Sequence, residues 1–391
     1  MEAPDVFAPA ALGPVRLRNR VIKAATFEGM TPNALVTDHL VDYHLAVARG
    51  GVGMTTVAYL AVAPEGRTDR HQIYLRDAAL PGLRLLTDAV HVEGAAVAAQ
   101  IGHAGPVANG RSNRRQALAA SRMPSPLSLQ MVRTATEADL RTIRRQYVDG
   151  VRLAVRAGFD GLELHLGHNY LLSSFLSPNL NRRQDAWGGS LAGRARFPRE
   201  VVQAVREAVG DQVAVTAKLN MTDGIRSGFQ VEESIEFARM LEEDRTLDAL
   251  QLSAGSSLTN PMYLFRGDVP LREFAAAMPF PVRVGMRLAG NRFLRSYPFE
   301  EAFLQPLARR FREALSMPLT LLGGLNRRAS LEQAMAEGFD YVAMARALLR
   351  EPDLVNRMQD GSAEQGLCIH CNRCMPTIYS GTRCVVIQEA S

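Results

Sequence analysis

Short apolar runs alternate with longer amphipathic stretches from residue 21 to about residue 350, and no Pro- or Ser-rich linker interrupts them. Such runs between helical stretches are typical of parallel strands that are buried on both faces. Eight runs of this kind are present: Val21–Ala25, Met54–Val57, Ala95–Ile101, Gly161–His165, Val213–Leu219, Ala249–Ser253, Leu319–Leu322 and Tyr341–Ala343. Eight strands, each followed by a helix, are what a closed (β/α)₈ barrel requires. The sequence therefore predicts an α/β fold of the TIM-barrel class.

Four of the intervening stretches have a clear helical pattern. Apolar residues recur at helical spacing between Glu137 and Ala157, and Thr136 and Asp139 have the spacing of a capping box at the start of this helix. Three more helices begin near turn signals and end near Gly, Asp or Pro: Arg194–Val209, Glu232–Glu243 and Phe299–Leu315. We expect these helices to cover the outside of the barrel.

The chain is longer than a barrel of this class needs, since about 250 residues are typical. We assign residues 1–360 to the barrel and residues 361–391 to a C-terminal extension that carries all four cysteines. Residues 254–298 form the plainest insertion, between the sixth strand and its helix. Long loops of this kind are usually functional, and this one carries Tyr263, Phe265 and Phe293. We therefore interpret it as a long loop that acts as a lid.

Composition excludes several classes of protein. With 47% hydrophobic and 22% charged residues, the chain matches a folded globular protein. Its 45 basic and 40 acidic residues are interspersed, so we do not expect nucleic-acid binding. The N-terminus lacks a signal-peptide pattern, and no apolar run reaches the roughly 18 residues of a membrane span. We expect a cytoplasmic protein with small-molecule partners and no membrane partner; its oligomeric state stays open, a homo-oligomer included.

Three residues at and just beyond the fourth predicted strand are candidates for catalysis. His165 ends the strand, and His168 and Tyr170 follow it. This is the carboxyl end of a barrel strand, the face on which active sites of TIM barrels lie. Two imidazoles can donate hydrogen bonds to one carbonyl oxygen, and a nearby phenol can supply a proton. The sequence thus predicts a site that can polarise an enone.

The cysteines form a local site and not a disulfide framework, because all four lie within residues 368–384. Cys368, Cys371 and Cys374 have the C-x₂-C-x₂-C spacing of thiolates that surround one cluster or metal ion, and Cys384 follows. An iron–sulfur cluster, a structural zinc ion and a set of reduced thiols all agree with this spacing.

The stretch from Gly158 to Phe197 resembles the old yellow enzyme family and its relatives, the 2,4-dienoyl-CoA reductases and trimethylamine dehydrogenase. The similarity includes H-x-x-H-x-Y at His165, His168 and Tyr170 and D-x-W-G-G-S-L-x-x-R-x-R-F from Asp185 to Phe197. In the family the paired polar residues hold the carbonyl of the substrate, and the tyrosine is commonly the proton donor. The resemblance therefore implies these roles for His165, His168 and Tyr170.

The same resemblance implies the residues that bind FMN. Ala24, Ala25 and Thr26 are similar to the family's first strand, which lies under the flavin, although Ala25 replaces the usual Pro and Phe27 stands where some members have a flavin-modulating Cys or Thr. The Q-x-x-H-x-G segment at Gln100 implies an amide that hydrogen-bonds the flavin pyrimidine. Lys218 matches a basic residue beside flavin N1 and O2, where a cation favours reduction.

The phosphate of FMN is expected at the ends of the last two strands, the usual phosphate site of this barrel. The resemblance places backbone N–H groups there, with charge from the arginine and with Ala345 in place of the usual Gly; the residues are Gly323, Gly324, Ala345 and Arg346.

Relatives with a C-terminal nucleotide domain hold a [4Fe–4S] cluster in a similar cysteine run, which relays electrons from that domain to FMN. The resemblance implies this cluster at Cys368, Cys371, Cys374 and Cys384, although this chain stops at Ser391 without a second nucleotide domain.

The function expected from these features is ene reduction: NADH or NADPH reduces FMN, which then transfers hydride to an electron-poor alkene such as an enone or a dienoyl thioester. Three alternatives remain at this point. They are an amine-type dehydrogenase that passes electrons out through the cluster, a non-catalytic flavin or iron–sulfur electron carrier, and a lyase for phosphorylated substrates on the same barrel.

Overall fold

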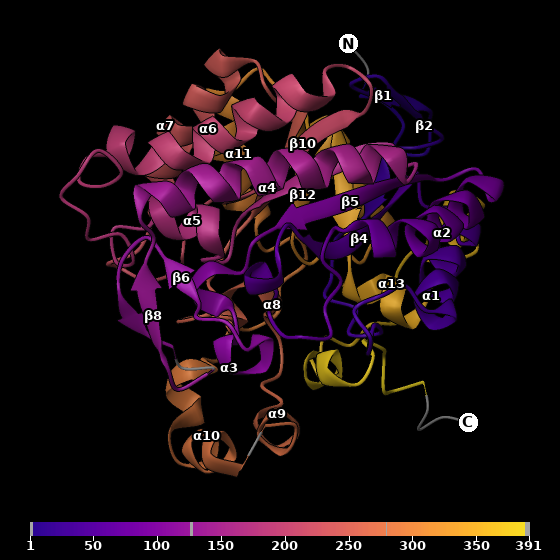
Figure 1. Ribbon diagram of the computed structural model, residues 1–391. Coiled ribbons are helices and arrows are strands. Elements are labelled where there is room, and N and C mark those ends of the chain that lie inside the picture. The colour runs from indigo at the N-terminus through magenta and orange to yellow at the C-terminus, as the bar shows by residue number, and fades with distance from the viewer. Residues whose placement is uncertain (1–2, 126–127, 279, 388–391) are drawn as a thin grey trace.

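A closed barrel of eight parallel strands forms the centre of the molecule in the computed structural model, which describes residues 3–125, 128–278 and 280–387 (Figure 1). The strands follow the order β10-β11-β12-β13-β3-β4-β5-β9. They are β3 (Val21–Lys23), β4 (Met54–Ala61), β5 (Ala96–Gly102), β9 (Gly161–Leu166), β10 (Ala214–Asn220), β11 (Ala249–Ser253), β12 (Leu319–Leu322) and β13 (Tyr341–Met344). All eight predicted strands are confirmed. Only β4 is much longer than predicted. It continues to Ala61, whereas the predicted strand ended at Val57.

A hairpin closes the amino-terminal end of the barrel. Its strands, β1 (Ala10–Leu12) and β2 (Val15–Leu17), lie at the opposite end of the molecule from α9 (Leu271–Ala276) and α10 (Phe280–Phe293) in Figure 1. Leu12 and Leu17 pack among small side chains at the starts of the barrel strands, including Ala96, Ala214 and Ala249. Small residues there leave room for the two leucines. The barrel is therefore plugged at this end, and its other end is left for a site.

Helices surround the barrel as predicted. The outer layer includes α1 (Asp38–Arg49), α2 (Leu80–Val92), α4 (Glu137–Arg156), α6 (Leu191–Val209), α7 (Val231–Asp244), α11 (Gln305–Ala314), α12 (Arg328–Ala336), α13 (Arg346–Arg350) and α14 (Leu354–Gln359). The capping box at Thr136 and Asp139 is present. The predicted start at Phe299 was wrong, because α11 begins at Gln305, where a proline in the first turn favours helix initiation.

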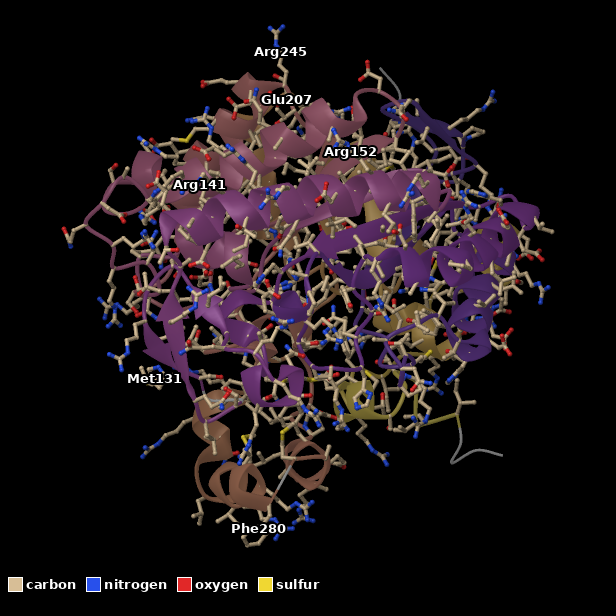
Figure 2. The ribbon with its side chains drawn as sticks, viewed as in Figure 1. Met131, Arg141, Arg152, Glu207, Arg245 and Phe280 are labelled. Atoms are coloured by element: carbon tan, nitrogen blue, oxygen red, sulfur yellow. The ribbon has the colours of Figure 1, made fainter. Side chains whose placement is uncertain are left out.

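The insertion differs from the loop that the sequence suggested. It contains α8 (Met262–Phe265), α9 (Leu271–Ala276) and α10 (Phe280–Phe293), and α9 and α10 project away from the barrel (Figure 1). Phe280 lies at the outer tip of this projection (Figure 2) and is 77% exposed. Met262, Leu294 and Met375 form a separate small core, which joins the insertion to the C-terminal extension. This local core explains how the segment folds outside the barrel.

Shorter elements complete the carboxyl end of the barrel. A small sheet precedes α4, and α5 (Leu171–Leu176) follows β9. The sheet consists of β6 (Leu118–Ala119), β7 (Met123–Pro124) and β8 (Met131–Thr134), and α3 (Gly110–Asn113) lies before it. Among the described residues, no helix has both the length and the apolar character needed to cross a bilayer.

Candidate active site

His165, His168 and Tyr170 come together at the carboxyl end of β9. The ring of Tyr170 stacks on that of His165, with centroids 4.3 Å apart and planes inclined by 26°. The rings of His165 and His168 meet edge to face at 5.1 Å. A turn makes this cluster possible, because His168 and Asn169 both have left-handed backbone conformations, with φ of +59° and +62°. The turn folds Tyr170 back over the end of its own strand.

Both imidazoles are held neutral. Burial is the main cause that lowers the pKa of His165 well below its ordinary value and the pKa of His168 to about 3, and the positive charge of Lys218 acts in the same direction. Nδ1 of His165 accepts a hydrogen bond from the N–H of Gly167 at 3.2 Å, so its proton belongs on Nε2. Nε2 of His168 is 2.8 Å from Oγ of Ser253. Each neutral ring carries one N–H group, which for His165 is on Nε2.

Tyr59 is a member of this cluster that sequence reasoning missed. Its ring is edge-on to Tyr170 at 5.3 Å and to His165 at 6.3 Å, and its hydroxyl donates to the carbonyl of Gly66. The predicted second strand ended before Tyr59, whereas β4 extends past it. The apolar run continuing to Ala63 was the available signal. Tyr59 therefore forms part of the wall beside the two candidate catalytic rings.

Gln100 and Lys218, which come from different strands, are joined through a third residue. Nε2 of Gln100 donates to Oε1 of Glu163 at 2.7 Å, and Nζ of Lys218 lies 3.1 Å from the same oxygen. All three side chains are buried. Burial lowers the pKa of Lys218, and the charge of Glu163 opposes this shift. Glu163 was not predicted as a site residue, although an acid inside the apolar strand Gly161–Leu166 was a signal for a buried partner.

A polar surface inside the barrel continues beyond this trio. Gln251 is opposite Lys218 in the register of β10 and β11. Its Nε2 atom is buried and has no hydrogen-bond partner within the described part of the chain. An unpaired buried amide is costly unless a further group satisfies it. The uracil-like edge of a flavin has both donors and acceptors, so its chemistry fits Gln100, Lys218 and Gln251.

The ends of β12 and β13 offer unpaired donors for the predicted phosphate. Within the described ranges, no acceptor pairs with the backbone N–H groups of Gly323, Gly324, Ala345 and Arg346. Gly323 and Gly324 have φ of +119° and +78°, which favours glycine at both positions. The side chain of Arg346 donates to the carbonyl of Arg266 and to Oδ1 of Asn372. Its contacts therefore lie toward the C-terminal extension, while its backbone N–H fits a phosphate.

The loop after β3 carries the three residues expected under the flavin. Ala24 packs inside the barrel, and its N–H donates to the carbonyl of Met344 at 2.8 Å. Ala25 packs against the same cluster of buried side chains as Tyr170. Oγ1 of Thr26 is 3.0 Å from the hydroxyl of Tyr43. The loop is thus held by hydrogen bonds to the end of β13 and to α1.

A buried ion pair that sequence reasoning missed anchors the same loop. Nζ of Lys23 lies 3.4 Å from Oε1 of Glu28, whose carboxylate also accepts from the N–H of Ala58. The carbonyl of Glu28 accepts from the N–H of Thr382 at 2.7 Å. The loop under the predicted flavin and the cysteine-bearing extension are therefore in direct contact.

The four cysteines line one cavity together with Arg346 and Asn372, and none is in a disulfide. Burial raises the pKa of Cys374 to about 11, and the positive charge of Arg346 opposes this shift. In the described part of the chain, no group of three or more His, Cys, Asp or Glu side chains has the geometry of a metal site. The donors have the right chemistry for a cluster, but they are not gathered into a ligand shell.

Sequence comparison connects this site with known enzymes. Residues 5–259 match the NADH:flavin oxidoreductase / NADH oxidase family. The chain is 58% identical over 383 residues to 4,4'-dithiodibutanoate disulfide reductase of Rhodococcus erythropolis, covering 98% of this chain and 95% of that protein.

The fold is also similar to those of enzymes whose structures are solved. The fold is similar to 2-naphthoyl-CoA reductase, with a TM-score of 0.83 at 25% identity, covering 97% of this chain and 56% of that one. It is also similar to histamine dehydrogenase from Rhizobium sp. 4-9, with a TM-score of 0.78 at 25% identity, covering 97% of this chain and 52% of that one. The chain therefore spans about half the length of these two enzymes.

Proposed function

Because the chain belongs to the NADH:flavin oxidoreductase / NADH oxidase family and is an NAD(P)H-dependent flavin oxidoreductase, we propose that it binds FMN and reduces an electron-poor alkene, such as an enone or a dienoyl thioester. The observation that carries this proposal is the cluster of His165, His168 and Tyr170 at the open end of the barrel. Bound FMN would accept hydride from the nicotinamide and pass it to the alkene.

The residues of the chain supply the remaining chemistry. His165 and His168, both neutral, donate N–H hydrogen bonds to the carbonyl oxygen and stabilise the negative charge that develops there. Tyr170 gives its phenolic proton to the α-carbon while the β-carbon receives hydride. The stacking of Tyr170 on His165 holds the proton donor beside the oxygen-binding ring.

Gln100, Lys218 and the four unpaired N–H groups would hold the cofactor. Gln100 and Lys218 would hold the flavin pyrimidine, and Glu163 contacts both side chains. The N–H groups of Gly323, Gly324, Ala345 and Arg346, which are unpaired within the described residues, would bind the phosphate.

The decisive experiment separates the two half-reactions. The yellow holoprotein is reduced anaerobically with NADH or NADPH in a stopped-flow instrument and then mixed with enones and dienoyl thioesters. Bleaching by a nicotinamide followed by recovery of colour with an alkene supports the proposal. A protein that holds no flavin, or a reduced protein that no alkene reoxidises, contradicts it.

A second candidate acceptor is an organic disulfide that carries carboxylates. The 58% identity to a 4,4'-dithiodibutanoate disulfide reductase favours it. In that reaction one sulfur takes the hydride as the S–S bond breaks, and the other leaves as a thiolate that Tyr170 protonates, so two thiols form. Reoxidation by 4,4'-dithiodibutanoate, with two thiols released per disulfide and no reoxidation by enones, would select this reaction.

We also propose a [4Fe–4S] cluster at the four cysteines, which share one cavity beside the loop after β3. Such a cluster would supply a one-electron carrier near the flavin. An amine-type dehydrogenase that sends electrons out through it is the rival route, and the similarity to histamine dehydrogenase favours testing it. Anaerobic bleaching by an amine without any nicotinamide would support that rival; flavin that no partner reduces or reoxidises would indicate an electron carrier.

A further inference from the structure

Arg266 follows α8 (Met262–Phe265), and its side chain is surrounded by aromatic rings. Its guanidinium carbon lies 4.8 Å from the ring centroid of Phe303, 5.3 Å from that of Tyr263 and 5.8 Å from that of Tyr297. No carboxylate in the described ranges forms an ion pair with it, and its buried Nε has no hydrogen-bond partner there. Three rings thus surround a guanidinium whose buried Nε is unpaired within the described residues.

The backbone of Arg266 is fixed in an unusual conformation. Its φ of +36° is a region that residues other than glycine rarely adopt. The carbonyl of Arg266 accepts from Nη1 of Arg346 at 3.1 Å and from Nδ2 of Asn372 at 3.0 Å. Conformations of this kind persist where the surroundings impose them, and they gather at ligand sites. The surrounding contacts therefore aim this side chain at the three rings.

The position of Arg266 adjoins the unpaired N–H groups at the ends of β12 and β13. Phe303, which its guanidinium faces, also packs on Gly324, where an added Cβ would lie 2.6 Å from Cδ1 of the ring. On the other side, the carbonyl of Arg266 is bonded to Arg346. Arg266 is thus linked to the end of β12 through Phe303 and to the end of β13 through Arg346.

We propose that Arg266 binds the phosphate group of FMN, so that the insertion supplies part of the cofactor site. The inference rests on the proposed binding of FMN. Neutral N–H groups can orient a phosphate, but a dianion in a partly buried site also needs a cation. Nη1 of Arg346 is committed to Asn372 and to the carbonyl of Arg266, which turns this edge of its guanidinium toward the C-terminal extension. Arg266 is a second neighbouring cation, its buried Nε is unpaired within the described residues, and a guanidinium matches phosphate oxygens in a forked geometry.

The test compares FMN with riboflavin, which lacks the phosphate. Apoprotein is prepared from the holoprotein, and each ligand is titrated by quenching of flavin fluorescence. Arg266→Met keeps an unbranched apolar stem against the rings and removes the charge. We expect it to weaken FMN binding by about tenfold or more, the usual effect of losing a hydrogen bond to a charged group, and to leave riboflavin binding unchanged. Arg287→Met, at an exposed position of α10 in the same insertion, is the control for the change in charge.

Equal losses for FMN and riboflavin, or no loss for either, would overturn the inference, because Arg266 would then only support the packing of the insertion. Arg266→Lys keeps the charge without the fork and provides the same comparison if the methionine variant does not fold. A reduced preference for FMN over riboflavin supports the inference, and an unchanged preference overturns it. Wild-type apoprotein that binds neither ligand refutes the proposed function itself, a result distinct from failure of the Arg266 variants alone.

Discussion

The ring of Tyr170 stacks on the ring of His165 with centroids 4.3 Å apart, so the proposed proton donor and one proposed oxygen ligand form a single stacked unit. Their separation along the chain is only five residues, and the left-handed turn at His168 and Asn169 makes the stacking possible. The arrangement allows the two functions to be separated by substitution, because the ring and the hydroxyl of Tyr170 contribute differently.

Tyr170→Phe keeps the ring and removes the phenolic proton. We expect reoxidation of the reduced flavin by an enone to slow by about a hundredfold or more, the usual contribution of a positioned general acid, while reduction by nicotinamide is unchanged. Stopped-flow absorbance measures both steps. Tyr59→Phe is a matched control, since the hydroxyl of Tyr59 is bonded to the carbonyl of Gly66. Equal slowing of both half-reactions in Tyr170→Phe would contradict the proton-donor role.

His168 should make the protein less stable as the pH falls. Burial lowers its folded-state pKa to about 3, whereas an unfolded histidine titrates near about 6.5. Between these values the unfolded chain binds a proton that the folded chain does not, so acid favours unfolding, and the loss ceases below the folded-state pKa. The contribution of one such group approaches about 1.4 kcal/mol per pH unit in this window. Urea unfolding at several pH values should show a shallower decline for His168→Asn; identical slopes for the two proteins would count against a buried neutral imidazole.

Glu163 and Lys218 form a buried pair whose partners depend on each other. Glu163→Gln leaves a buried ammonium without its counter-charge, and we expect a loss of about 3 kcal/mol in the free energy of unfolding. Lys218→Met leaves the carboxylate unpaired and should cost a similar amount. The double variant should lose less than the sum of the two, as urea denaturation would show. Additive losses would mean that the two charges do not interact.

The cysteine cavity predicts a specific metal content. Protein purified without oxygen should contain iron and acid-labile sulfide in equal amounts, and Cys374→Ala should lose both while keeping FMN. Iron analysis, sulfide analysis and visible spectra before and after the substitution provide the measurement. Ser380→Ala, on the same extension but outside the cysteine cavity, is the control. Zinc in place of iron, or metal content unaffected by Cys374→Ala, would refute the iron–sulfur proposal.

The barrel could be predicted from the sequence because each central strand is buried on both faces and therefore appears as an apolar run between amphipathic helices. The clustering of His165, His168 and Tyr170 also followed from the sequence, since they lie close together after one strand. Contacts between side chains of different strands were harder to predict from the sequence. The bond from Gln100 through Glu163 to Lys218 depends on the register of β5, β9 and β10, which no local pattern specifies.

The insertion, residues 254–298, shows a second limit of prediction from sequence. Its aromatic residues suggested a lid, which stays a prediction. What the sequence did not show is that Met262 and Leu294 form a small core with Met375, which is far along the chain. Helical structure in this segment therefore depends on a partner outside it. For the same reason Arg266 could not be connected from sequence to the glycines at the end of β12, because Phe303 links them only in the folded protein.

Because the hairpin β1–β2 covers the amino-terminal end of the barrel, we expect reactants to reach the proposed flavin from the carboxyl end. Nicotinamide and acceptor would then bind alternately at the same face of the cofactor, and the two would not be bound at the same time. Steady-state velocities measured with both reactants varied should give parallel lines in double-reciprocal plots. A high concentration of either reactant should inhibit turnover, because that reactant would also occupy the site in the flavin form that reacts with the other.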